Sequence, residues 1–280
     1  MNHSRGSIVA PDSTKLAYQC WLPEQSPEGV FLFVHGIGGH SGQPTYTYLI
    51  DFLVGAGLVV YGLDLRGHGN SEGPRGHVNR WGDYLDDVST MLQKLRSDHP
   101  DIPLFLFGQS LGGLISLEVA IEKGSELSGV IASAPALALK NPTLVFLVRL
   151  ISNIFPLLKV DIGLDPRLFT RDTQELPRLK DDPLRQPRVT TRVLGGVHEA
   201  IPRVHANAHL LKIPVLIIVG EADGVTPPHG TKKFIDNATI ADKMLKTYEG
   251  GYHQPMVDIN RDEVFADILG WIRAHMPVPS

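Results

Sequence analysis

Residues 104–113 read LFLFGQSLGG and join a run of apolar residues to a G-x-S-x-G pentapeptide, Gly108-Gln109-Ser110-Leu111-Gly112. The helix-like stretch 111–122 follows directly. Between a strand and a helix, the serine of this motif sits on a strained turn, so that its hydroxyl projects from the carboxyl edge of a sheet. The flanking glycines leave room for the turn, because a Cβ would clash with neighbouring elements. A glycine-rich turn without chemistry is the alternative.

Other apolar runs predict the sheet to which this turn belongs. They cover residues 29–34, 58–63, 130–132 and 215–219. Continuous apolar runs bounded by turn residues suit strands that are buried on both faces of a parallel sheet. Stretches with helical character alternate with them, at 84–95, 111–122 and 261–275. We therefore expect an α/β fold with a mostly parallel central sheet flanked by helices, preceded by an antiparallel hairpin of residues 7–10 and 15–22.

The alternation breaks down between residues 136 and 210. Prolines are frequent there, at Pro142, Pro156, Pro166, Pro177, Pro183, Pro187 and Pro202. Because proline breaks long elements into short ones, we expect a helical cap of short helices inserted between two core strands. Residues 1–135 and 211–280 would then form the two parts of the core. The alternative is that the stretch belongs to a layer of the core sheet.

A serine hydroxyl is a poor nucleophile at neutral pH and needs a base. In this kind of fold the chain order is serine, then an acid, then histidine. His253 follows a strand-like stretch at 244–248 and precedes the last helix, so we expect it to be the general base. Asp223, just past the run 215–219, would fix the imidazole tautomer and stabilise the imidazolium. Glu221 is the alternative acid.

Acyl transfer also needs hydrogen-bond donors for the oxyanion. We expect these to be the backbone N–H groups of Leu111 and of Ile37, which lies in the loop after the run 29–34. The apolar stretch 143–158 places Phe146 and Leu150 on one broad stripe. We expect these two residues, together with Gly36 and Gln109, to contact the substrate. The alternative is that the stripe only packs on the core.

Composition excludes several classes of protein. The chain has 280 residues, a formal net charge of −4 and 42% hydrophobic residues, which gives no support to nucleic-acid binding. With Cys20 as the single cysteine, no intrachain disulfide can form. The polar N-terminus and the lack of a run of about 18 apolar residues favour a cytoplasmic protein, with peripheral contact to lipid surfaces left open. We expect no cofactor and no metal site, and the oligomeric state is not indicated.

Several motifs together resemble the monoacylglycerol lipase and lysophospholipase family of the α/β-hydrolase superfamily. They are HGIGGHSG at 35–42, DLRGHGNSEG at 64–73, GQSLGG at 108–113, DPL at 182–184 and YEGGYH at 248–253. The resemblance covers nearly the whole chain. It implies the α/β-hydrolase fold, a cap over a tunnel for one acyl chain, and the same catalytic serine, acid, histidine and backbone donors.

Two departures bear on the substrate. Mammalian members carry a histidine where Gln109 stands, and a glutamate and an arginine that help hold glycerol where Gly39 and Gln43 stand. We expect a serine hydrolase that cleaves monoacylglycerol-like esters through an acyl-enzyme, releasing a fatty acid and glycerol, with the glycerol held loosely. The alternatives are a lysophospholipase, a small-ester esterase, an aminopeptidase, or a non-catalytic binding protein on this fold.

Overall fold

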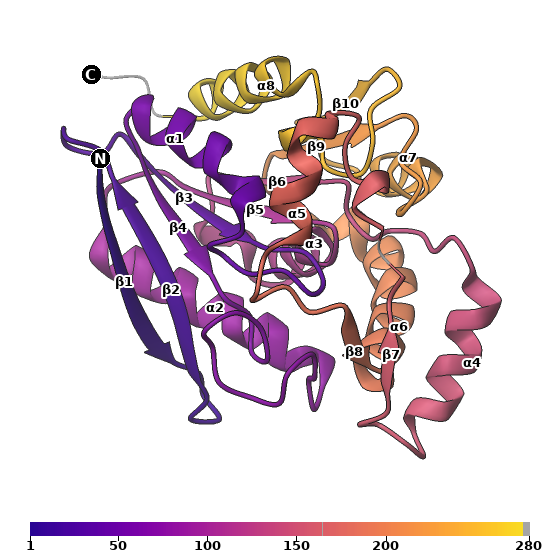
Figure 1. Cartoon of the computed structure of the whole chain (residues 1–280). Coiled ribbons are helices and arrows are strands. Elements are labelled where there is room, and N and C mark those ends of the chain that lie inside the picture. The colour runs from indigo at the N-terminus through magenta and orange to yellow at the C-terminus, as the bar shows by residue number, and fades with distance from the viewer. Residues whose placement is uncertain (164, 277–280) are drawn as a thin grey trace.

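The computed structural model of the chain describes residues 1–163 and 165–276. Its central feature is an eight-stranded sheet in the order β1-β2-β4-β3-β5-β6-β9-β10 (Figure 1). β1 pairs antiparallel with β2, and β2 pairs antiparallel with β4. All the other neighbouring strands in this sheet are parallel. The strands are β1 (Asn2–Val9), β2 (Lys15–Leu22), β3 (Gly29–Val34), β4 (Leu58–Leu63), β5 (Leu104–Gln109), β6 (Gly129–Ser133), β9 (Val215–Gly220) and β10 (Lys243–Tyr248).

Helices cover both faces of the sheet and bury its apolar side chains (Figure 1). One face packs against α1 (Thr47–Gly55) and α8 (Arg261–Ala274), and the other packs against α2 (Trp81–Asp98), α3 (Leu111–Lys123) and α6 (Thr191–Asn207). α7 (Pro228–Asn237) lies between β9 and β10 in the chain. Strands β3, β4, β5, β6 and β9 are buried along their whole length, which is why they appear in the sequence as unbroken apolar runs.

The predicted α/β fold, a mostly parallel central sheet flanked by helices, is confirmed, including the antiparallel hairpin at the sheet edge. Several bounds differ from the prediction. β1 begins at Asn2, and α2 extends over Trp81–Asp98 rather than 84–95. Helix α1 was not predicted, because only Leu49, Ile50, Leu53 and Val54 carry its buried face, and nine residues are a short window for a helical period.

We call residues 136–210, which connect β6 to β9, the inserted segment. It contains α4 (Pro142–Ser152), β7 (Lys159–Asp161), η3 (Pro166–Leu168), η4 (Thr173–Glu175), α5 (Leu176–Lys180), β8 (Arg188–Thr190), α6 and η5 (Ala208–Leu210). β7 and β8 form a small antiparallel sheet. α4 packs on the outer side of α6, at the edge of the molecule (Figure 1).

One element of the inserted segment contradicts the expectation of short helices. α6 has 17 residues and continues through Pro202. A proline inside a helix removes one backbone hydrogen bond and crowds the preceding turn. The helix nevertheless continues because its buried face, including Val193, Val197, Ala200 and Val204, packs into the main core. Here tertiary packing outweighs local propensity.

Candidate active site

Ser110 stands at the junction of β5 and α3, in a backbone conformation that few residues adopt. Its φ is 55° and its ψ is −114°. Such a positive φ costs a non-glycine residue of the order of 1–3 kcal/mol and persists only where the surroundings enforce it. The Ser110 N–H donates to the Ser133 carbonyl at 2.9 Å, and its own carbonyl accepts from Leu114 and Ala136. The strained turn predicted from the pentapeptide is therefore present.

The glycines of the pentapeptide are required by close packing. A Cβ on Gly108 would overlap the Gly112 carbonyl, and a Cβ on Gly112 would overlap the Val34 carbonyl at the end of β3. Gly36 is similarly restricted, because a Cβ there would meet the side chain of Gln109 and lie 3.3 Å from the Ser110 Cβ. These contacts bring the strand, the helix and the loop after β3 together around the serine.

His253 lies within hydrogen-bonding distance of the serine. Its Nε2 is 3.1 Å from the Ser110 Oγ, and its Nδ1 is 2.9 Å from the Asp223 Oδ2. The amide nitrogen of Gln109 lies 3.4 Å from the same Nε2. Because the ionised Asp223 can only accept, Nδ1 carries the ring proton and Nε2 is left with the lone pair that faces the serine. The three side chains that the sequence singled out thus meet in one hydrogen-bonded chain.

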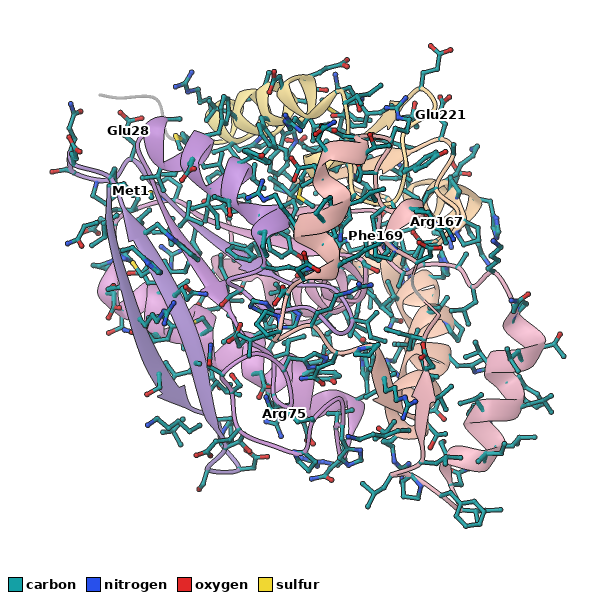
Figure 2. The ribbon with its side chains drawn as sticks, viewed as in Figure 1. Met1, Glu28, Arg75, Arg167, Phe169 and Glu221 are labelled. Carbon is teal, nitrogen blue, oxygen red and sulfur yellow. The ribbon has the colours of Figure 1, made fainter. Side chains whose placement is uncertain are left out.

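The Asp223 carboxylate is held in the ionised form. Burial raises its pKa, but hydrogen bonds and charge from His253 and Thr226 outweigh burial, so the pKa lies below its ordinary value. Oδ1 accepts from the N–H groups of Val225 and Thr226 at 2.8 and 2.9 Å, and Oδ2 also accepts from the Thr226 hydroxyl at 2.7 Å. The alternative acid, Glu221, is exposed at the outer edge of the molecule (Figure 2).

The two expected oxyanion donors belong to Leu111 and Ile37, which both lie close to Ser110. Leu111 is the first residue of α3, so its N–H has no acceptor within the helix. Ile37 lies in the loop after β3 and lines the same cavity as Ser110. This loop is fixed by His35, whose Nδ1 lies 2.8 Å from the Gly36 carbonyl while its Nε2 accepts from the Leu65 N–H at 3.1 Å. Their role as oxyanion donors stays a prediction.

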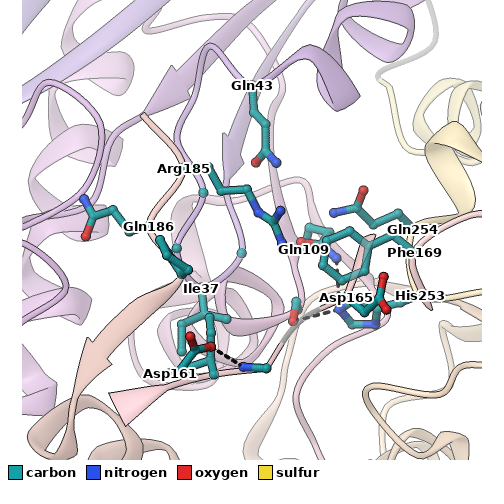
Figure 3. Close-up of a pocket in the computed structure, with 17 residues that line it drawn as sticks. Ile37, Gln43, Gln109, Asp161, Asp165, Phe169, Arg185, Gln186, His253 and Gln254 are labelled. Atoms are coloured by element: carbon teal, nitrogen blue, oxygen red, sulfur yellow. Dashed lines mark hydrogen bonds between the residues drawn. The ribbon is translucent and has the colours of Figure 1, made fainter. Parts of the chain in front are cut away.

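A cavity of about 370 Å³ opens over Ser110 and His253 (Figure 3). Gly36 and Gln109 line it, as expected from the sequence. Its other lining residues include Gly38, Gly39, Gln43, Asp161, Ile162, Gly163, Asp165, Phe169, Arg185, Gln186, Pro187 and Gln254. The side chains of Gln43, Arg185 and Gln254 converge at one end of the cavity (Figure 3). This polar end was not predicted, because its members lie far apart in the sequence.

Phe146 and Leu150 are not among the described residues that line this cavity, in contrast to the expectation. They lie on α4 and are 42% and 46% exposed. The ring of Phe146 lies 5.8 Å from the ring of His198 on α6. Because α4 packs on the outer side of α6, its apolar stripe faces α6 and the solvent rather than Ser110.

Comparison with known proteins gives consistent matches over most of the chain. A family model described as "Serine aminopeptidase, S33" matches residues 25–260. The chain is 29% identical to a monoacylglycerol lipase of Mycolicibacterium smegmatis, over 98% of each chain. It is 33% identical to the monoglyceride lipase of Mus musculus, over 88% of this chain and 82% of the relative. A soluble variant of Saccharomyces cerevisiae monoglyceride lipase, solved with a substrate analogue, is 26% identical with a TM-score of 0.90 and covers 100% of this chain and 97% of its own.

Proposed function

The chain belongs to the monoacylglycerol lipase family of the α/β-hydrolases, and from that premise we propose that it hydrolyses the ester bond of monoacylglycerol-like lipids. The observation that carries the proposal is the hydrogen-bonded chain from the Ser110 Oγ through His253 to Asp223. An arrangement in which a base faces a serine hydroxyl and an ionised acid orients that base is suited to acyl transfer.

In the proposed reaction, His253 Nε2 takes the proton of Ser110 as its Oγ attacks the ester carbonyl. The N–H groups of Ile37 and Leu111 stabilise the oxyanion of the tetrahedral intermediate. The imidazolium then gives its proton to the departing glycerol oxygen, which leaves an acyl-serine. Water, deprotonated by His253, attacks the acyl carbon of this acyl-enzyme. The imidazolium returns that proton to the Ser110 Oγ as the ester bond breaks, which releases the fatty acid and restores the free serine. Asp223 stays ionised and stabilises the imidazolium throughout.

The size of the cavity supports a single acyl chain. About 370 Å³ is near the lower end of the range of about 300–1,000 Å³ for small-molecule sites. We infer that the inserted segment, residues 136–210, acts as a cap that closes this space over the core formed by 1–135 and 211–280. Ile162, Phe169, Arg185 and Gln186, which all belong to the inserted segment, line the cavity. A glycerol with two or three acyl chains would not fit beneath such a cap.

The polar end of the cavity changes the expectation about the alcohol. The sequence indicates loosely held glycerol, because Gly39 and Gln43 replace an acidic and a basic residue of mammalian members. The amides of Gln43 and Gln254 and the guanidinium of Arg185 supply donors and acceptors on that side instead. We therefore propose that free hydroxyls of the glycerol bind there.

A panel of lauroyl esters at equal dispersion tests this function. We expect 1-monolauroylglycerol to be hydrolysed well above dilaurin and trilaurin, and at least tenfold faster than methyl laurate. Trilaurin turnover equal to that of the monoester would contradict the single-chain cavity. Equal rates on methyl laurate would contradict glycerol binding at the polar end. The panel also includes lauroyl lysophosphatidylcholine and an amino acid p-nitroanilide. Faster hydrolysis of the first would favour a lysophospholipase, and faster hydrolysis of the second would favour an aminopeptidase.

We further propose that the inserted segment contacts lipid surfaces through α4 and the residues after it. Large apolar side chains are exposed there, namely Leu144, Phe146, Leu147, Leu150, Ile151, Ile154, Phe155, Leu157 and Leu158. A contiguous exposed apolar patch of this kind marks an interaction surface, and a lipid ester is delivered from such an interface. Among the described residues, no helix combines the length and the apolar character that a bilayer span requires.

A further inference from the structure

The loop that carries His253 is held by the inserted segment. We call residues 168–171, at the end of η3, the brace. The His253 N–H donates to the Leu168 carbonyl at 3.3 Å, and the Gln254 N–H donates to the Phe169 carbonyl at 2.8 Å. The Thr170 hydroxyl donates to the Val257 carbonyl at 2.8 Å. The backbone around the proposed general base is therefore tied to the brace.

Asp258 joins the brace to this loop through one carboxylate. It is fully buried, with 0% exposure. Oδ1 accepts from the Arg171 backbone N–H at 2.8 Å and from the Ile259 N–H at 3.0 Å. Oδ2 accepts from the Tyr252 N–H at 3.0 Å, directly before the histidine, and from the Arg171 Nε at 2.9 Å. Five residues after His253 in the chain, the carboxylate thus fixes the backbone on both sides of the imidazole.

The Arg171 guanidinium extends the same connection to both ends of the loop. Its Nη1 donates to the Glu249 carbonyl at 3.1 Å, and its Nη2 donates to the Asn260 Oδ1 at 3.0 Å. Gly250 has a φ of 60°, and a Cβ there would lie 3.1 Å from the Arg171 Nη1. The loop is therefore shaped closely around this arginine, which belongs to the inserted segment.

The loop depends on the docked brace for an electrostatic reason. A buried carboxylate is tolerated only when it is paired and its oxygens accept hydrogen bonds. Asp258 obtains both from Arg171 and from the loop amides. In addition, the Phe169 ring of the brace lies 5.8 Å from the His253 ring and bounds the space that the imidazole occupies. Displacing the brace would leave the carboxylate unpaired and the loop free to rearrange.

We propose that Asp258 and Arg171 are positioning residues for the reaction, holding the loop 249–258 so that the His253 Nε2 stays within reach of the Ser110 Oγ. This inference rests on the proposed roles of Ser110 and His253. A displacement of about 1 Å between reacting groups can cost about a hundredfold in rate. The pair should therefore affect the chemical step, measured as kcat, more than the binding of a small soluble ester, measured as KM.

The test uses the whole chain, p-nitrophenyl butyrate and a temperature at least 15 °C below each variant's Tm. Asp258→Asn places an amide where both oxygens now accept, and Arg171→Lys keeps the charge but loses the planar set of donors. We expect kcat to fall tenfold or more in each, with KM changed less than threefold. Asp258→Glu should recover part of kcat. Folded variants with kcat within twofold of the parent would overturn the proposal. If Asp258→Asn does not fold, the kcat of Arg171→Lys tests the proposal in its place.

A matched control separates positioning from general stability. Arg203 on α6 pairs with the buried Glu118 on α3, which also accepts from the Trp81 indole at 2.7 Å. Arg203→Met should lower Tm while kcat stays within twofold. If it lowers kcat as much as Asp258→Asn does, then any destabilisation of the inserted segment is enough to lower kcat. The proposal of a specific positioning role for Asp258 and Arg171 would then fail. Ser110→Ala runs alongside: an active Ser110→Ala would instead defeat the proposed function.

Discussion

Asp223 gives the sharpest expectation for a single side chain. Asp223→Asn keeps the shape but allows the amide to donate toward the His253 Nδ1, which favours the wrong imidazole tautomer. We expect kcat to fall roughly ten-thousandfold while the fold persists. Steady-state hydrolysis of p-nitrophenyl butyrate measures this, with Glu221→Gln as the control at an exposed site. If Glu221→Gln were the damaging change, the acid would be misassigned.

Two fully buried histidines, His35 and His68, make stability depend on pH. Burial lowers the pKa of His35 to about 4 and that of His68 to about 3. In the unfolded chain both have a pKa of about 6.5, so below that pH the unfolded state binds more protons than the folded state. As far as these two groups are concerned, the free energy of unfolding should stay constant above about pH 7 and decline as the pH falls from about 6.5 toward 4. The two groups together account for a loss of roughly 3–4 kcal/mol by pH 5.

Urea unfolding at pH 7.5, 6 and 5 measures this decline. His68→Phe removes one titrating ring at a buried site beside Tyr84 and should make the decline smaller by about 2 kcal/mol, whatever its effect on stability at pH 7.5. Equal free energies of unfolding at pH 7.5 and pH 5 in the parent protein would show that these rings do not resist protonation.

At the residue scale, the sequence was informative where chain order and motif constrain position. Ser110 lies in a motif, and Asp223 and His253 each follow a predicted strand, so the edge of the sheet brings them together. Gln43, Phe169, Arg185 and Gln254 follow no such rule. They come from separate loops of the core and the inserted segment and meet only through tertiary packing. Asp258, seen alone, resembles any loop carboxylate, and its partner lies 87 residues away.

At the scale of a single element, the proposed lipid contact of helix α4 can be tested by substitution. Phe146→Glu together with Leu150→Glu places two charges on its exposed apolar stripe. If this stripe contacts lipid, co-sedimentation with phosphatidylcholine liposomes should fall several-fold, because inserting charges at the interface opposes burial of apolar area. The rate on the soluble ester p-nitrophenyl butyrate should stay within twofold, since neither residue lines the cavity. Val9→Glu, at an apolar residue that is 62% exposed on β1, is the matched control. Unchanged sedimentation of the folded double variant would count against lipid contact.

A helix or strand could be predicted from the sequence when one or both of its faces are buried in the core. The fully buried strands appear as apolar runs, and their bounds moved by one or two residues at most. In the inserted segment the same reasoning failed. α4 is apolar yet mostly exposed, so its stripe does not reveal what it packs on. α6 continues through Pro202 because the core supports it.

At the scale of the whole molecule, two halves of a core and an inserted segment share the active site. The loop after β3 supplies Ile37, the turn between β5 and α3 supplies Ser110, and the first residue of α3 is Leu111. The loops after β9 and β10 supply Asp223 and His253. Residues of the inserted segment line the cavity and accept hydrogen bonds from the loop of the histidine. Catalysis should therefore be lost by changes in any of the three parts. The contribution of the inserted segment could not be predicted from the sequence, because it depends on contacts across long separations in the chain.

Hydrolysis of 1-monolauroylglycerol by Ser110→Ala, compared with the parent protein, tests the central claim most directly. The measurement is the rate of lauric acid release, with circular dichroism to verify that the variant is folded. Without the serine oxygen no acyl-enzyme can form, so we expect the parent to turn over and the variant to lose at least about a thousandfold in kcat. The parent should also gain the mass of one phosphonyl group on Ser110 with a fluorophosphonate, and the variant should not. A folded Ser110→Ala that keeps more than a tenth of the parent rate would contradict the account.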